Sequence, residues 1–128
     1  MKSKDFTNWN DYNEYSFGRF VAQRREELGL SARQLSALVG MSPVYLCDIE
    51  RGHRKAPENY MSAFVTHLKI SPEELDNFYI MAYATNGKYF EFKEYLNENY
   101  YARTFLRIAK NKNLSEEEWQ KIIEQIKG

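Results

Sequence analysis

The sequence predicts an all-α protein. Its 128 residues include only six glycines and three prolines, and no short run alternates polar and apolar residues over the length of a strand. Apolar residues recur at helical spacing instead, and capping signals divide the chain into segments of helical length. Because 43% of the residues are hydrophobic, a chain of this length can bury a core without disulfide bonds.

Five helices are predicted over the first two thirds of the chain. They cover residues 15–28, 32–39, 43–50, 57–68 and 72–84. The first of them ends at Gly29, since glycine commonly terminates helices. The second begins at a capping box, in which the side chains of Ser31 and Gln34 each accept a hydrogen bond from the other residue's backbone N–H.

The other three helices each begin near a proline. Ser42 is the N-cap of the third helix, and Pro43 occupies its first turn. Pro57 is expected to open the fourth helix, and the fifth combines Pro72 with a capping box that begins at Ser71. The residues expected in the core share helical spacing; they are Phe17, Phe20, Val21, Leu28, Leu35, Val39, Leu46, Ile49, Tyr60, Met61, Phe64, Val65, Leu68, Leu75, Phe78, Tyr79 and Ala82.

A second helical region follows Asn86-Gly87. Helices are predicted over residues 90–95 and 98–110, and a last helix over 116–127 begins at a capping box on Ser115. Its apolar residues form an i, i+3, i+4, i+7 stripe. The stripe consists of Trp119, Ile122, Ile123 and Ile126. We expect this stripe to be buried either within the same chain or across a dimer interface.

The formal net charge is zero, from 18 basic and 18 acidic residues, which at first sight argues against nucleic-acid binding. The charges are unevenly distributed, however. Residues 1–16 carry a net charge of −1, residues 17–70 carry +3, and residues 71–128 carry −2. Because the local field matters more than the sum, the middle of the chain can still present a positive face.

Several classes of protein are disfavoured by the composition. The single cysteine, Cys47, allows no internal disulfide, so a cytoplasmic location is expected. No apolar run approaches the roughly 20 residues that cross a membrane, and the polar start does not resemble a signal peptide. His53 and His67 lack cysteine partners at zinc-ligand spacing, and no catalytic motif occurs. We therefore expect no metal, no cofactor and no enzymatic activity.

The second and third predicted helices are joined by Gly40-Met41-Ser42, a short glycine-containing turn that is typical of a helix-turn-helix. The chain around this turn resembles the lambda-repressor-like, Xre-type DNA-binding domains. The residues that carry the resemblance are the run from Arg25 to Ser31, then Leu35 and Gly40, and then residues 41–52. This resemblance covers residues 17–84 and implies a five-helix DNA-binding domain.

The rest of the chain is divided accordingly. Residues 1–16 form an N-terminal arm. Its stretch from Asp5 to Tyr12 is acidic and aromatic and is expected to dock on the body of the protein or on a partner subunit. Residues 85–128 form a helical extension for dimerisation or partner contact. Within it, residues 98–126 are similar to a tail found on many such regulators in Gram-positive bacteria and their mobile elements.

The resemblance also implies roles for single residues, since the second helix of the motif lies in the major groove in this fold. The residues expected to face bases are Pro43, Val44 and Asp48. The residues expected to contact phosphates are Arg33, Ser42, Tyr45, Arg51, Arg54 and Lys55. Val44 can pack on a thymine methyl, and Asp48 can accept a hydrogen bond from a cytosine amine.

Arg25 and Glu50 match an arginine and a glutamate that pair in the family. We expect them to form a partly buried ion pair that locks the first helix to the recognition helix. Two positions depart from the family pattern, because Ala32 and Pro43 stand where polar or basic residues that contact DNA are common. Asp48 would in addition repel phosphate.

These observations favour a sequence-specific regulator of transcription that binds double-stranded DNA, with no chemistry of its own. A repressor is expected, acting as a homodimer on a pseudo-palindromic operator. The alternative is an antitoxin or adaptor that binds a partner protein through its C-terminal helices. Such a partner would be a toxin, a protease or another regulator, and Pro43 and Asp48 at groove-facing positions keep this alternative open.

Overall fold

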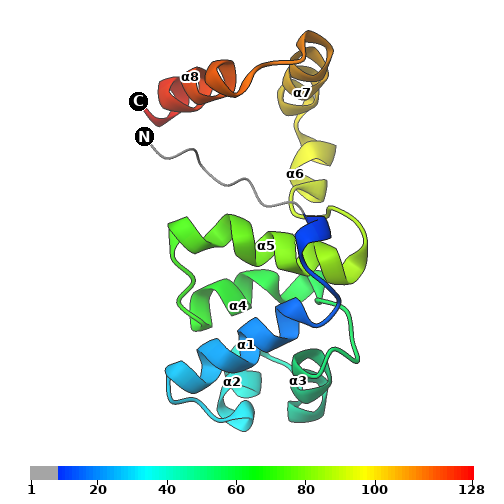
Figure 1. Ribbon diagram of the computed structural model, residues 1–128, viewed down its shortest axis with the longest axis vertical. Coiled ribbons are helices and arrows are strands. Elements are labelled where there is room, and N and C mark those ends of the chain that lie inside the picture. Colours follow the sequence, from blue (N-terminus) through cyan, green and yellow to red (C-terminus); the bar gives the residue numbers. More distant parts are fainter. Residues whose placement is uncertain (1–8) are drawn as a thin grey trace. The chain divides into compact units, whose positions relative to one another are not determined.

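The computed structural model describes residues 9–128, and all regular structure in this range is helical, as the sequence predicts. The elements are η1 (Trp9–Asp11), α1 (Ser16–Glu27), α2 (Ala32–Val39), α3 (Pro43–Glu50), η2 (Glu58–Tyr60), α4 (Met61–His67), α5 (Pro72–Asn86), α6 (Lys93–Glu98), α7 (Tyr100–Lys112) and α8 (Glu116–Lys127). The chain forms two compact units, of which the first ends at Glu91 and the second runs from Phe92 to Gly128 (Figure 1). No helix in residues 9–128 is both long and apolar enough to cross a membrane.

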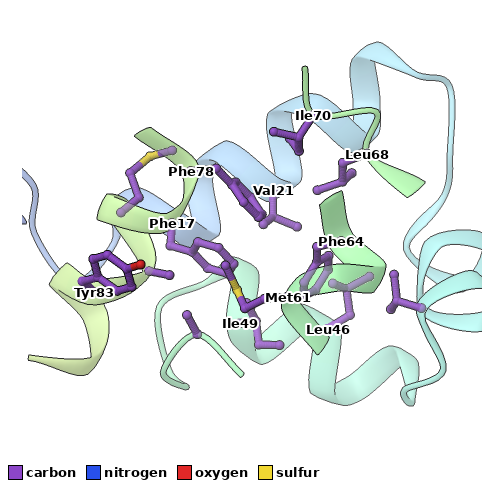
Figure 2. Close-up of a cluster of buried hydrophobic side chains, with 14 of the residues drawn as sticks. Phe17, Val21, Leu46, Ile49, Met61, Phe64, Leu68, Ile70, Phe78 and Tyr83 are labelled. Atoms are coloured by element: carbon purple, nitrogen blue, oxygen red, sulfur yellow. The ribbon is translucent and has the colours of Figure 1, made fainter. Parts of the chain in front are cut away.

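The first unit encloses one hydrophobic core between its five α-helices. Helix α1 contacts α3 and α5, and α2 contacts α3 and α4. Side chains from α1, α3, α4 and α5 point toward a common centre (Figure 2). The Phe17 ring lies 6.0 Å from that of Phe64, edge to face, and 5.2 Å from that of Phe78. Aromatic contacts of this kind stabilise a core beyond the area that they bury.

Local capping signals determine where most helices begin and end. Helices α2, α3 and α8 span the predicted residues, and Ser31, Ser71 and Ser115 form the predicted capping boxes. Gly40 ends α2 in a left-handed conformation with φ of 87°, which glycine adopts at little cost. These boundaries follow from hydrogen bonds within a few residues, and for that reason the sequence predicts them well.

The prediction that Pro57 opens the fourth helix is wrong. Pro57 is extended, with φ and ψ of −85° and 111°, and it precedes the short helix η2, so that α4 begins only at Met61. Both Pro57 and Ala56 are buried, and the Ala56 carbonyl accepts a hydrogen bond of 3.1 Å from the Asn86 side chain. This tertiary anchor holds the segment extended.

The helix predicted over 90–95 is also displaced, because α6 begins at Lys93. Phe90 is buried in the core of the first unit instead, where its ring packs edge to face on that of Tyr83 at 5.2 Å. The Tyr83 hydroxyl donates a hydrogen bond of 2.8 Å to Glu91, whose pKa is raised by burial. The first compact unit therefore continues past Ala84 as far as Glu91.

The described part of the N-terminal arm lies on the first unit. Helix η1 contacts α5, and the Tyr12 side chain packs against the core. The prediction that the arm docks on the body is confirmed for these residues. The rest of the predicted contact, over residues 5–8, lies outside the part of the chain that the structure describes.

The second unit has little core of its own. Ala109 is the only buried residue among residues 92–128. Arg103 holds α6 to α7 by donating to the carbonyls of Leu96 and Asn97, at 2.7 and 2.9 Å. On α8, Trp119 and Ile122 are half-buried, whereas Ile123 and Ile126 are exposed.

Candidate nucleic-acid interface

Helices α2 and α3 pack against each other and are joined by the tight turn over residues 40–42. The Ser42 side chain accepts a hydrogen bond of 3.1 Å from the Tyr45 backbone N–H, and Pro43 follows it in the first turn. This cap satisfies a backbone donor at the N-terminus of α3 and fixes where the helix begins. The two helices therefore have the connectivity of a helix-turn-helix.

Helix α3 has a buried face and an exposed end. Leu46 and Ile49 are buried in the core, as the helical spacing predicts. Ser42, Pro43 and Val44 are exposed at the N-terminus, and 72% of the Val44 surface is accessible. An exposed valine at the start of an otherwise well-packed helix is suited to an apolar contact with a ligand such as a thymine methyl group.

Three side chains that sequence analysis treats separately form one cluster. The Arg54 Nε atom lies 3.7 Å from a carboxylate oxygen of Asp48, and the Arg54 guanidinium lies 4.9 Å from the centre of the Tyr45 ring. The Tyr45 ring in turn packs edge to face on Tyr60 at 6.0 Å. Arg54 thus places a positive charge beside Asp48, which offsets the repulsion that this carboxylate would exert on a phosphate.

The other basic residues expected at the interface are accessible. Arg33 is exposed in the first turn of α2, Arg51 is exposed at the C-terminal cap of α3, and Lys55 is exposed in the loop that follows. Within residues 9–128, none of these three side chains takes part in an ion pair. Their charges are therefore available to an anionic ligand.

Arg25 and Glu50 form the ion pair that the family resemblance implies. Two parallel hydrogen bonds join them, from Nε to Oε2 at 2.8 Å and from Nη2 to Oε1 at 3.0 Å, and Arg25 also donates to the Leu30 carbonyl at 2.9 Å. The two side chains are only 14% and 10% exposed. Hydrogen bonding to Glu50 raises the pKa of Arg25, and the pair ties α1 to the end of α3.

A second paired arginine, which sequence analysis did not identify, lies one residue earlier. Arg24 pairs with Glu74 of α5 through its Nη1 and Nη2 atoms, and Nη1 also donates to the Leu68 carbonyl at 3.1 Å. The hydrogen bond from Arg24 lowers the pKa of Glu74 to about 2. The sequence marks Glu74 only as a capping residue, because nothing local indicates a partner 50 positions away.

Gly18 and Gly52 also position α3. A Cβ atom on Gly18 would lie 2.2 Å from the Ile49 carbonyl oxygen, so only glycine lets α1 approach the end of α3 this closely. Gly52 has φ of 81° and faces the Tyr15 ring. A glycine within a predicted helix, such as Gly18, is a sequence signal for a close approach of this kind.

Comparisons with known proteins agree with this geometry. Residues 16–78 match the family model described as a helix-turn-helix domain. The chain is also similar to proteins from two strains of Mycobacterium tuberculosis, each named as an uncharacterized HTH-type transcriptional regulator, with 38% identity over 58 residues. These matches cover 45% of this chain and 41% of each relative. No solved structure matches the chain. The matched residues, which span α1 to α4 and the first part of α5, are thus similar to a helix-turn-helix domain.

Proposed function

We propose that this protein is a sequence-specific transcriptional regulator that binds double-stranded DNA through a lambda-repressor-like, Xre-type domain. The observation that carries the proposal is the exposed N-terminus of α3, a helix of the matched domain that is anchored to the core by Leu46 and Ile49. A helix held in this way can enter the major groove and present its first residues to base edges.

Base reading is assigned to the exposed and half-exposed residues of α3. Val44 packs on a thymine methyl, Asp48 accepts from a cytosine amine, and Pro43 contributes shape rather than hydrogen bonds. The residues assigned to phosphate contact are Arg33, Ser42, Tyr45, Arg51, Arg54 and Lys55. Arg54 has two functions in this arrangement, because it contacts phosphate and holds Asp48 and Tyr45 in place.

The charge distribution supports a dimeric mode of action. Residues 17–70 carry a net charge of only +3, so the affinity of a single domain for DNA of any sequence should be modest. A homodimer that binds two half-sites roughly 34 Å apart gains affinity from both domains. Occupancy of such an operator would repress transcription in the cytoplasm by excluding polymerase, with no catalytic step and no cofactor.

A second candidate is an antitoxin or adaptor that binds a partner protein, such as a toxin, a protease or another regulator. The exposed apolar residues on α7 and α8 favour it, since surfaces of this kind often bind other proteins. The two functions are compatible, because one chain can bind DNA through its first unit and a protein through its second.

Selection from a random duplex library, followed by anisotropy titrations at several salt concentrations, tests the proposal. We expect the Arg33→Ala and Arg51→Ala variants to weaken binding to all sequences and to reduce the dependence of affinity on salt. Val44→Ala should instead change the preferred sequence. Lys121→Ala, which removes one charge from α8, is the matched control and should bind like the parent.

Failure to enrich any sequence, or an affinity that does not depend on salt, would contradict the DNA-binding proposal. If Val44→Ala binds every operator variant with the parent's preference, the assignment of α3 to the major groove is wrong.

A further inference from the structure

The loop over residues 52–57 follows the C-terminal cap of α3 and carries Arg54 and Lys55, two of the residues that we assign to phosphate contact. The first half of this loop is tied to α3. The His53 backbone N–H donates a hydrogen bond of 2.8 Å to the Asp48 carbonyl, and Arg54 pairs with the Asp48 side chain at 3.7 Å. Residues 55–57 lie in no helix, so their position depends on contacts with other elements.

A cavity of about 380 Å³ lies beside residues 55–57. It is lined by residues 55–60, by Tyr45 of α3, by Asn86 at the end of α5, and by Lys88. Because this side of the loop faces open space, close packing does not restrain it there. The loop is therefore held at single points on this side.

Asn86 provides one of these points. Its Nδ2 atom donates a hydrogen bond of 3.1 Å to the Ala56 carbonyl. Ala56 is only 3% exposed, and Pro57, which follows it, is also buried. The bond therefore satisfies a backbone acceptor of a buried residue, and it ties the second half of the loop to α5.

The other end of the same amide indicates that this bond is the reason for a polar side chain at position 86. The Oδ1 atom of Asn86 is buried, and no group within residues 9–128 donates a hydrogen bond to it. Burial of an acceptor in this way costs stability, so a side chain that served only packing would be apolar here. The bond from Nδ2 to the Ala56 carbonyl offsets that cost and fixes the loop.

A second link joins the same two regions but is weaker. The Lys88 Nζ atom lies 3.5 Å from a carboxylate oxygen of Glu58, which follows the loop directly. Because 62% of the Lys88 side chain is exposed, solvent screens this ion pair and it contributes little. Asn86 is therefore the main anchor between the end of α5 and the loop.

We propose that Asn86 is a positioning residue for DNA binding, which holds the loop over residues 52–57 so that Arg54 and Lys55 meet the phosphate backbone. Asn86 acts through the loop and makes no contact with DNA itself. Ordering these two cations before DNA binds removes part of the entropic cost of the contact. The inference rests on the proposed function, because it concerns the phosphate contacts assigned to this loop.

A mutational cycle on the full chain tests the proposal, with the affinity for a labelled duplex of mixed sequence measured by anisotropy at low salt. Asn86→Leu removes the donor and keeps a similar volume. We expect it to weaken binding about three- to tenfold, the range that corresponds to the net contribution of one hydrogen bond. In the Arg54→Ala/Lys55→Ala background, which has lost both loop cations, the same substitution should change the affinity less than about twofold. In the Arg33→Ala background it should have its full effect.

The matched control Asn77→Leu makes the same substitution at an exposed position of α5 and should bind like the parent. Asn86→Ala, which removes the donor without a bulky replacement, should give the same pattern as Asn86→Leu. An equal loss of affinity in all three backgrounds would overturn the proposal, since Asn86 would then act on the stability of the whole unit. An Asn86→Leu variant that binds like the parent would overturn it as well.

Amide hydrogen exchange without DNA separates this inference from the proposed function. The Tyr60 backbone N–H donates a hydrogen bond of 3.0 Å to the Pro57 carbonyl, next to the anchored residue. We expect exchange of this amide to become about tenfold faster in Asn86→Leu and to stay unchanged in Asn77→Leu. A parent chain that binds no duplex would overturn the proposed function together with the role of the loop cations. Unchanged exchange at Tyr60 in Asn86→Leu, with a parent that does bind DNA, would overturn this inference alone.

Discussion

The two units of the chain are both helical, but they are stabilised in different ways. The first unit buries residues from α1, α2, α3, α4 and α5 in one core and locks α1 in place with two arginine pairs, Arg25–Glu50 and Arg24–Glu74. The second unit, over residues 92–128, buries only Ala109 and depends on caps and on the Arg103 hydrogen bonds. Helices without a buried face are marginal, so we expect the second unit to be the less stable of the two.

This difference suits a regulator. The residues that we assign to DNA lie on the unit with the large core, whereas the exposed apolar residues of α7 and α8 lie on the unit with little core of its own.

Truncation of one phenylalanine in each unit should have the most unequal effects. Phe64 is fully buried, and Phe64→Ala should lower the free energy of unfolding by about 3–5 kcal/mol because it leaves a cavity. Phe105 is exposed over two fifths of its surface, and Phe105→Ala should cost less than about 1 kcal/mol. Urea unfolding at a protein concentration low enough to keep the chain monomeric measures both. Equal losses would show that the second unit has a core comparable to the first.

Removal of one partner from the Arg25–Glu50 pair should have the next largest effect. Arg25→Ala leaves a nearly buried carboxylate unpaired and should cost about 3 kcal/mol. The double variant Arg25→Leu/Glu50→Leu should recover much of this loss, since it removes both charges together. Urea unfolding of the single and double variants measures both free energies of unfolding. If the double variant is as unstable as Arg25→Ala, the loss comes from the missing ion pair rather than from the unpaired charge of Glu50.

The sequence predicts the helix boundaries that depend on local interactions, and it fails where a boundary depends on long-range contacts. The boundaries of α2, α3 and α8 depend on caps such as Ser31 and Ser42, which can be recognised within four residues. The extended Pro57 and the burial of Phe90 depend on contacts with α5, which the sequence does not reveal.

The features of the candidate site also fall into those that the sequence predicts and those that depend on long-range contacts. The burial of Leu46 and the exposure of Val44 follow from helical spacing, and the family resemblance implies the Arg25–Glu50 pair. The contact of Arg54 with Asp48 and Tyr45 requires the loop after α3 to fold back over that helix. No sequence spacing predicts such a contact.

Acidification should weaken the first unit through Glu74. Its pKa falls from 4.5 to about 2 in the folded protein, so the charged form contributes stability above pH 4.5 that is lost as the pH falls toward 2. Glu74→Gln can keep the capping box with Ser71 while removing the charge, so it should be less stable than the parent at pH 7 and nearly equal to it near pH 2. Urea unfolding across this range tests it. A difference between the two proteins that does not change with pH would show that Arg24 does not stabilise the charged form.

The smallest expected effects come from the capping boxes, which are alike in the two units. Ser31→Ala removes the cap of α2, which packs on α3 and α4, and should lower the free energy of global unfolding by about 1 kcal/mol. Ser115→Ala removes the corresponding hydrogen bond from α8, which has no buried residue among its described positions, and should leave global unfolding unchanged. Its effect should appear instead as faster amide hydrogen exchange confined to residues 116–127. If Ser115→Ala lowered global stability as much as Ser31→Ala, α8 would be coupled to the core of the first unit, and the two units would unfold as one.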